Sequence, residues 1–304
     1  MSSHLHYKRT FYRRFYRAEI FEILMRARHC VGAGIACRVA RAIARIYTAT
    51  HPEVVEVVRD NLSLLQTTPT DRKSAVRVFE NFSEMLADYF SLYREPPRKA
   101  TAMCPERQGE QILMDVFRAG KGAILVTAHF GFFELGCALL ANLGIPLTIL
   151  TMSEPTHAMT RWRADFRTHW KADSLTIGTD PFASLEVIRT LRQGRFIAML
   201  VDRPLDQNTL VIETPGGKTS FSLSAALLAH LADCPMIPIA IWKADKVYRM
   251  RTHEAIRVTS PAGRKVAIEE GTRKLANCLL QNIIQTPEQW YQFVPARFSA
   301  FAAC

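Results

Sequence analysis

The most constraining feature of the sequence is an alternation, after about residue 96, between short apolar runs and longer segments with helical periodicity. The apolar runs have the length of β-strands and cover residues 122–127, 147–151, 196–201 and 236–242. The expected helices cover residues 131–143, 156–170, 184–192, 221–232 and 266–284. Strands that are apolar at every position are buried on both faces, as in a parallel sheet between two helical layers. The pattern therefore predicts an α/β domain with a mostly parallel sheet flanked by helices.

The residues before that point lack strand-like runs and have the periodicity of helices. Val78 and Phe82 belong to a series of apolar residues at three- and four-residue spacing, which is typical of one helix face. The Pro-Pro pair at residues 96–97 ends this series, because proline breaks a helix and restricts the residue before it. We therefore expect an N-terminal helical segment over residues 1–95 and the α/β domain over residues 96–304.

The net charge of the chain is +11, from 39 Lys and Arg against 28 Asp and Glu. Residues 1–48 hold ten of the basic and two of the acidic side chains, a net charge of +8. Arginines interrupt the apolar residues of the stretch 20–47, which predicts a basic amphipathic helix. Such a helix can lie on an anionic bilayer, or it can pack on the domain with its basic face in water. We expect no nucleic-acid partner, because no known binding motif accompanies the basic residues.

Other classes of protein are disfavoured by the sequence. The seven cysteines are scattered and no pair has the C-x-x-C spacing, so we expect reduced thiols and no metal site. The basic start lacks the apolar core of a signal peptide. The longest stretch without Asp, Glu, Lys or Arg, residues 135–153, contains Gly144 and Pro146. These two residues indicate a buried helix followed by a buried strand instead of a membrane span.

A histidine and a carboxylate follow the first strand of the expected sheet. His129 comes two residues after the run 122–127, and Glu134 lies five residues further on. In open parallel sheets, sites form beyond the carboxyl ends of the strands. If His129 lies in the turn and Glu134 in the first turns of the helix, the carboxylate can orient the imidazole. The other ring nitrogen can then remove a proton from an attacking hydroxyl, and free N–H groups at the helix start can bind an oxyanion.

The glycine between these two residues fits the interpretation. Gly131 supplies the flexible backbone that such a turn needs. The alternative is a structural histidine held in place by hydrogen bonds. His51 and Glu56 have the same spacing but follow no strand, so we do not expect that second pair to be catalytic.

The segment from Thr127 to Glu134 resembles the H-x4-D/E block of glycerolipid-type acyltransferases. It is most similar to that block in the bacterial lipid A late acyltransferase family, the lauroyl and myristoyl transferases. Further blocks resemble the family in the same order: a basic helix with Arg161, Arg163 and Arg167, a strand ending in Asp202, a small-residue helix leading to Pro238, and the Pro-Glu-Gln-Trp sequence ending at Trp290. The resemblance covers roughly residues 50–298, and several ordered blocks are more specific than any single motif.

The resemblance implies a glycerolipid acyltransferase-like fold and the transfer of a fatty acyl group. The donor would be a thioester of acyl-carrier protein (acyl-ACP) or of coenzyme A (acyl-CoA), and the acceptor a hydroxyl or amine of a lipid or glycolipid. His129 would act as general base with Glu134. Because a thiolate leaves without strong acid assistance, no metal or other cofactor is expected. The expected location is peripheral, on the cytoplasmic face of the inner membrane and in contact with its anionic surface.

The same resemblance implies a set of substrate-binding residues. Arg161, Arg163 and Arg167 would hold phosphates of the acceptor or of phosphopantetheine by charge-assisted hydrogen bonds, and the alternative for each is a solvated helix face. Asp202 is a further candidate because it ends a buried strand, although Asp is also common in caps and turns. Gly131 completes the expected substrate-binding set.

Two departures from the family pattern leave the acceptor open. Phe132 and Phe133 stand where the family has Asn-Trp, and residues 215–218 replace its aromatic-Gly element. The alternatives are therefore a transferase with a soluble acceptor, such as a specialised metabolite, and a thioesterase-like hydrolase that uses the same His–Glu pair with water. A non-catalytic basic protein that binds membranes or nucleic acid is a third interpretation.

Overall fold

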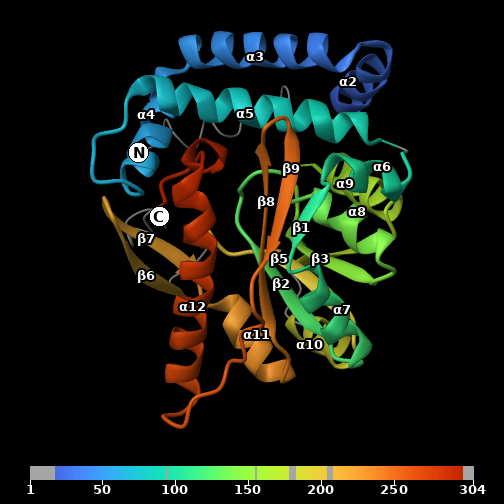
Figure 1. The fold of residues 1–304 in the computed structure, drawn as a ribbon, viewed down its shortest axis with the longest axis vertical. Coiled ribbons are helices and arrows are strands. Elements are labelled where there is room, and N and C mark those ends of the chain that lie inside the picture. Colours follow the sequence, from blue (N-terminus) through green and yellow to red (C-terminus); the bar gives the residue numbers. More distant parts are fainter. Residues whose placement is uncertain (1–17, 94, 155, 178–182, 204–207, 297–304) are drawn as a thin grey trace.

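The computed structural model describes residues 18–93, 95–154, 156–177, 183–203 and 208–296 of the chain. These residues form a seven-stranded sheet flanked by helices, with a further layer of helices across one end of the sheet (Figure 1). Neighbouring strands are parallel except for one antiparallel pair. The predicted fold class, a mostly parallel α/β sheet flanked by helices with a helical N-terminal segment, is therefore confirmed.

The strand order across the sheet is β1-β9-β8-β2-β5-β3-β4, and β8 and β9 are the antiparallel pair. The strands of this sheet are β1 (Glu106–Gln108), β2 (Ala123–Thr127), β3 (Leu147–Met152), β4 (Ala172–Ile177), β5 (Phe196–Leu200), β8 (Met236–Ala244) and β9 (Val247–Thr252). The first four residues of the central strand β2 are buried, because strands lie on both sides and helices cover both faces.

The helices fall into two groups, those of the N-terminal layer and those that flank the sheet. The layer consists of α2 (Ala18–Cys30), α3 (Ala33–Thr50), α4 (Pro52–Ser63) and α5 (Arg72–Ser91). The helices after the layer are α6 (Pro97–Met103), α7 (Glu110–Arg118), α8 (Leu135–Asn142), α9 (His157–Thr168), α10 (Ala183–Arg192), α11 (Ser224–Ala232), α12 (Arg264–Gln285) and the short 3-10 helix η1 (Pro287–Gln289).

The single amphipathic helix expected over residues 20–47 is instead two helices, α2 and α3, which are separated at Val31 and Gly32. α3 packs along α5 and buries Ala44 and Thr48, while α5 lies between α3 and the sheet (Figure 1). Asp71 begins α5 as its N-cap, because its side chain accepts a hydrogen bond of 2.7 Å from the backbone N–H of Ser74. α3 therefore forms the outer edge of the layer, away from the sheet.

The expected helix over residues 221–232 is wrong at its start, because a β-hairpin occupies the preceding residues. Strands β6 (Thr209–Thr214) and β7 (Gly217–Ser222) pair antiparallel, and α11 begins only at Ser224. The hairpin turn packs on the end of α4, where the N–H of Gly216 donates to the carbonyl of Leu64 at 3.0 Å. A Cβ on Gly216 would lie 1.9 Å from the carbonyl oxygen of Ser63, so only glycine allows this approach.

The uncharged stretch of residues 135–153 forms α8 and β3, as predicted. Across the described ranges, no helix combines the length and the apolar character needed to cross a bilayer.

Candidate active site

Two neighbouring strands bring His129 and Asp202 together at one edge of the sheet. β2 and β5 are parallel and in register, with Thr127 opposite Leu200. His129 and Asp202 each follow their strand by two residues, so the backbone of both arrives at the same place. The imidazole Nδ1 lies 2.8 Å from Oδ1 of Asp202. The site thus forms at the carboxyl ends of the strands, as expected for an open parallel sheet.

The carboxylate of Asp202 is fully buried and accepts hydrogen bonds from two residues, His129 and Trp290. The backbone N–H of His129 lies 3.1 and 3.0 Å from its two oxygens, and the indole N–H of Trp290 donates to Oδ2 at 2.9 Å. Burial alone raises the pKa of Asp202, but the neighbouring His129 and Arg203 and the Trp290 hydrogen bond together lower it to about 2. Asp202 is therefore ionised at neutral pH and can only accept hydrogen bonds.

This fixes the tautomer of His129. Because an ionised carboxylate has no proton to donate, Nδ1 must carry the proton that joins it to Asp202. Nε2 has no hydrogen-bond partner among the described residues, and the side chain is 24% exposed. Burial lowers the pKa of His129 below the usual 6.5, and Asp202 opposes that effect in part. At neutral pH the imidazole is thus uncharged, with a free basic nitrogen.

The segment after α12 holds this pair in place. The backbone N–H of Tyr291 donates to the carbonyl of His129 at 2.7 Å, and the side chain of Gln292 donates to the carbonyl of Asp202 at 2.7 Å. Arg203 donates to the side-chain oxygen of Gln292 at 2.8 Å. Asn61 of α4, which is buried, donates to the carbonyl of Gln292 at 2.8 Å. The C-terminal segment therefore links the edge of the sheet that holds His129 and Asp202 to the N-terminal helical layer.

Gly131 occupies the tight turn between His129 and α8, as predicted. Its φ is +55°, a backbone conformation that favours glycine. Its N–H donates to the carbonyl of Gln289 at 2.9 Å, and a Cβ would lie 1.9 Å from the carbonyl oxygen of Ile241. The turn is therefore pressed against β8 and η1. A contact of Gly131 with substrate stays a prediction.

The expected contact between Glu134 and His129 is not made. The carboxylate of Glu134 points to α9, where it binds Arg163 and accepts from Arg167 at 2.7 Å. The chain turns at Gly131, so the side chains of His129 and Glu134 point to different sides of the turn. Asp202 occupies the position beside the imidazole. The structure therefore assigns the orientation of His129 to Asp202. Whether Glu134 is needed for catalysis stays a prediction.

The arginines of α9 divide into two kinds. Arg167 is buried and Arg163 is partly buried between Glu134 and Glu154, to which it donates at 2.9 Å. Burial alone raises the pKa of Glu134, but Arg167 and Arg163 lower it to about 2. Arg161, in contrast, is exposed. Of the three predicted phosphate-binding arginines, only Arg161 is not already engaged by these two carboxylates.

Comparison with known proteins identifies the family. The sequence profile of the bacterial lipid A biosynthesis acyltransferases matches residues 8–298, nearly the whole chain. The chain belongs to this family. It is accordingly an acyltransferase, and the resemblance found from individual motifs is confirmed. No curated protein matches the sequence.

Sequence reasoning missed three residues that this acyltransferase places around His129. Trp290 was noticed only as part of the Pro-Glu-Gln-Trp sequence, and neither Gln292 nor Arg203 was singled out. Trp290 and Gln292 are 88 and 90 residues from Asp202 along the chain, so no local spacing links them. The available signal was indirect: a Trp and a Gln after the last helix of an α/β domain, close to a conspicuous Pro-Glu-Gln sequence.

The described residues of the acyltransferase contain no group of three or more His, Cys, Asp or Glu side chains placed to hold a metal ion. The expectation that it needs no metal or cofactor stays a prediction.

We expect Glu134→Gln to destabilise the acyltransferase by about 3–5 kcal/mol, because removing one partner of a buried ion pair leaves the other charge uncompensated. Arg167, whose side chain is 5% exposed, is the charge that would lose its carboxylate. Urea unfolding measures this difference. The control is Glu213→Gln, which breaks an exposed pair with Lys218 and should change stability little. Equal stabilities of the two variants would contradict the structural role of Glu134.

Proposed function

We propose that the enzyme transfers a fatty acyl group from an acyl-ACP or acyl-CoA thioester to a hydroxyl, or an amine, of a lipid or glycolipid acceptor. The observation that carries this proposal is the pairing of His129 Nδ1 with buried Asp202 at 2.8 Å, which leaves Nε2 free to act as general base. Membership of the acyltransferase family supports the class of reaction. The donor and the acceptor are part of the proposal.

In the proposed reaction, the acceptor oxygen attacks the thioester carbonyl carbon while its proton moves to Nε2 of His129. The tetrahedral intermediate then collapses, the C–S bond breaks, and the imidazolium returns the proton to the departing thiolate. Asp202 stabilises the imidazolium in between, because its charge lies 2.8 Å from Nδ1. The products are a free thiol and an ester, or an amide where the acceptor is an amine, and no other reactant is consumed.

The turn after Gly131 supplies the candidate oxyanion donors. The backbone N–H groups of Phe133 and Glu134 make no hydrogen bond within the described residues, whereas those of Gly131 and Phe132 are bound to Gln289 and Ile241. The ring of Phe133 lies 5.7 Å from that of His129, so this turn is close to the base. We assign the two free N–H groups to the developing negative charge on the carbonyl oxygen.

The positions of the arginines suggest separate roles in substrate binding. Exposed Arg161 is the best placed of the three to meet a phosphate of the donor or acceptor. Arg163 and Arg167 are held by Glu134, so we propose that they position the start of α8, including the oxyanion donors, through that carboxylate. Glu134 acts in this proposal as a positioning residue.

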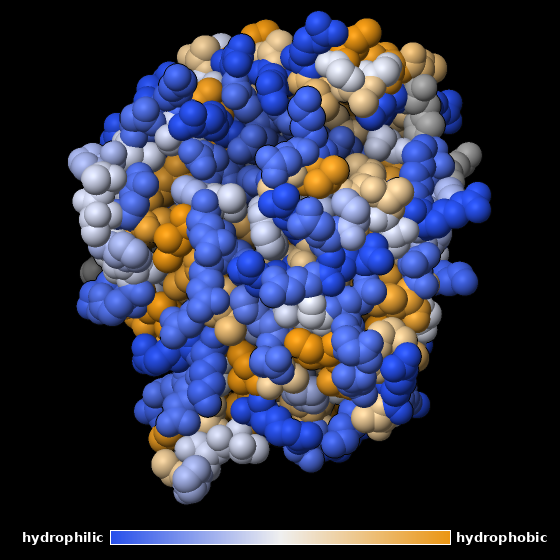
Figure 2. Space-filling view, viewed as in Figure 1, coloured by the Kyte–Doolittle hydropathy of each residue, from blue (hydrophilic) through white to orange (hydrophobic). Residues whose placement is uncertain are grey.

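The outer face of α3 is proposed to contact the anionic surface of the inner membrane, on its cytoplasmic side. Four large apolar side chains on this face are more than half exposed: Ile35, Val39, Ile43 and Ile46. Arginines flank them on the same helix, at positions 38, 41 and 45. Figure 2 shows hydrophobic and hydrophilic residues together along the edge of the molecule where α3 lies. This combination is typical of a helix that lies at a bilayer interface.

The proposed function is tested by supplying an acyl-ACP or an acyl-CoA with a labelled fatty acyl chain to the full-length enzyme, with and without a bacterial lipid extract. We expect label to enter a lipid product only when the extract is present. Label that appears mainly as free fatty acid with or without the extract would identify a hydrolase instead. No consumption of either thioester would overturn the proposal.

The pH dependence of the reaction should report the pKa of His129. Because this pKa lies below 6.5 and the neutral imidazole is the active form, kcat/KM should be constant above about pH 7.5. Below the pKa, kcat/KM should fall about tenfold per pH unit as His129 becomes protonated. The measurement is a kcat/KM profile from pH 4.5 to 8.5. A profile that falls only above pH 8 would rule out a neutral histidine base.

A further inference from the structure

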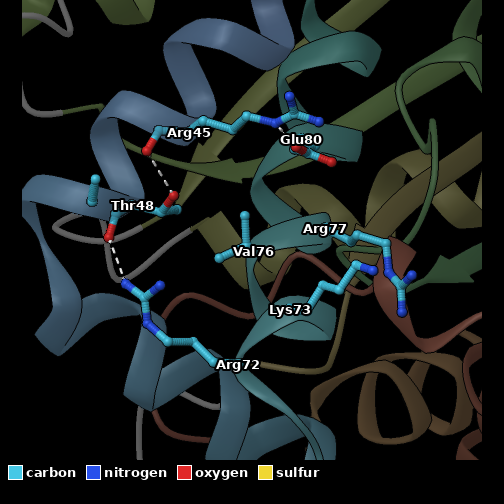
Figure 3. Close-up of a pocket in the computed structure, with 8 residues that line it drawn as sticks. Arg45, Thr48, Arg72, Lys73, Val76, Arg77 and Glu80 are labelled. Atoms are coloured by element: carbon cyan, nitrogen blue, oxygen red, sulfur yellow. Dashed lines mark hydrogen bonds and ion pairs between the residues drawn. The ribbon is translucent and has the colours of Figure 1, made fainter.

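A basic pocket lies at one end of the helical layer, between the last turns of α3 and the first turns of α5 (Figure 3). Its volume is about 390 Å³. The charged side chains in its lining are Arg45, Arg72, Lys73, Arg77 and Glu80. Four cations and one carboxylate give the pocket a net charge of +3. None of these residues belongs to the proposed acyl-transfer site.

Two of these cations lack a carboxylate partner within the described residues. Arg45 pairs with Glu80 at 2.5 Å, and Arg77 lies 3.3 Å from Glu288. Among the described residues, the side chain of Arg72 donates only to the carbonyl of Thr48, at 3.1 Å, and the side chain of Lys73 makes no hydrogen bond or salt bridge (Figure 3). Arg72 and Lys73 are consecutive residues at the start of α5 and both line the pocket, with the charged end of Arg72 toward Thr48 and that of Lys73 toward Arg77 (Figure 3). Cationic side chains around a hollow are suited to a phosphate group.

The pocket adjoins the exposed apolar face of α3. Successive residues of a helix are about 100° apart, so Ala49, which also lines the pocket, lies about 60° around α3 from Ile46. Ile43 and Ile46 are both more than half exposed. At its C-terminal end, α3 therefore lines the pocket with one side, and the neighbouring side, with Ile43 and Ile46, is apolar and exposed.

We propose that this pocket binds the phosphate group of an anionic lipid whose acyl chains lie against Ile43 and Ile46. An interfacial helix with its apolar face at the boundary between headgroups and acyl chains places its flanks among the lipid phosphates. The pocket lies on such a flank. The inference rests on the membrane contact proposed for α3 and goes beyond the acyl-transfer reaction, because it gives the enzyme a lipid site separate from His129.

Vesicle binding of the full-length protein tests the pocket. The variant is Arg72→Gln/Lys73→Gln, and the vesicles contain phosphatidylcholine either alone or with about 30% phosphatidylglycerol. One basic residue near an anionic surface contributes about fivefold in binding, so the double variant should bind the anionic vesicles about 25-fold more weakly. Binding to the neutral vesicles should be unchanged. Because Lys73 is exposed and its side chain makes no hydrogen bond or salt bridge to a described residue, Lys73→Gln alone should lose about fivefold without affecting folding.

Two matched double variants control for charge. Arg273→Gln/Lys274→Gln removes an adjacent, exposed Arg-Lys pair from the middle of α12, and should bind anionic vesicles within about twofold of the unchanged protein. Arg26→Gln/Arg38→Gln removes two exposed arginines outside the pocket, of which only Arg38 lies on the proposed membrane helix α3, so it should lose about fivefold and less than the pocket variant. Equal losses in the pocket and Arg26/Arg38 variants would show a diffuse basic surface and overturn the pocket.

A soluble phosphate is the competing source of the same chemistry. Coenzyme A binding that depends on Arg72 and Lys73, with vesicle binding that does not, would assign the pocket to a soluble ligand and overturn the lipid proposal. Failure of the acyl-transfer reaction is measured separately, by label transfer from the thioester. The two failures are therefore distinguishable, because vesicle binding requires no turnover.

Discussion

His129→Ala should lower kcat for acyl transfer by about 10²–10⁴-fold, the usual contribution of a general base. The alanine variant has no group at the position of Nε2 to take the acceptor proton, while the N–H groups of Phe133 and Glu134 are retained. KM for the thioester should change much less than kcat, because the imidazole accepts the proton in the transition state and does not bind the donor. The measurement is incorporation of a labelled acyl chain into lipid at pH 7.5.

The matched control is His51→Ala. His51 and Glu56 repeat the spacing of His129 and Glu134, but His51 stacks on Tyr47 in the helical layer, 4.4 Å between ring centroids. Its loss should leave kcat within about twofold. If His129→Ala is as active as His51→Ala, the histidine after β2 is structural and the proposed mechanism is wrong.

Asp202→Asn should lower kcat by a similar factor of about 10²–10⁴, for two physical reasons. The neutral amide no longer stabilises the imidazolium that forms in the reaction. In addition, both carboxylate oxygens accept N–H groups, from His129 and Trp290, so one of these donors would face the NH₂ group of asparagine. The imidazole could then adopt the other tautomer, in which Nε2 carries the proton and cannot act as the base.

The pH profile separates this role from a purely structural one. The charge of Asp202 raises the pKa of His129, so its removal should move the acid limb of kcat/KM to lower pH. Glu134→Gln, measured under conditions where it is folded, should leave the acid limb in place, because Glu134 does not contact the imidazole. If the acid limb of kcat/KM stays in place in Asp202→Asn and moves in Glu134→Gln, then Glu134 and not Asp202 is the partner of His129.

The elements that the sequence predicted well are those buried on both faces. β2, β5 and β8 are continuous apolar runs because strands and helices surround them, and this pattern is visible without knowledge of the fold. β4 was missed because only its first residue is buried, so its sequence has no apolar run. The hairpin β6–β7 was missed because it has no long apolar run: β6 buries only Ile212, and two of the three buried residues of β7 are Thr219 and Ser220.

The candidate site was predicted in part: three of its residues were recognised from the sequence, but not which of them are in contact. His129, Gly131 and Asp202 were each recognised from their positions after strands or in a turn. Their pairing was not, because the adjacency of β2 and β5 depends on the strand order, and His129 and Asp202 are 73 residues apart in the chain. The short spacing of His129 and Glu134 suggested a contact that the positive φ of Gly131 prevents.

The most direct test of the central claim, that Asp202 orients His129 as a neutral base, is the ¹⁵N NMR spectrum of the imidazole. The protein is labelled at histidine, and the signals of His129 are identified by their loss in His129→Ala. At pH 7.5 we predict a protonated Nδ1 and an unprotonated Nε2 for His129, and loss of this tautomeric preference in Asp202→Asn. A proton on Nε2, or a doubly protonated ring at that pH, would contradict the account.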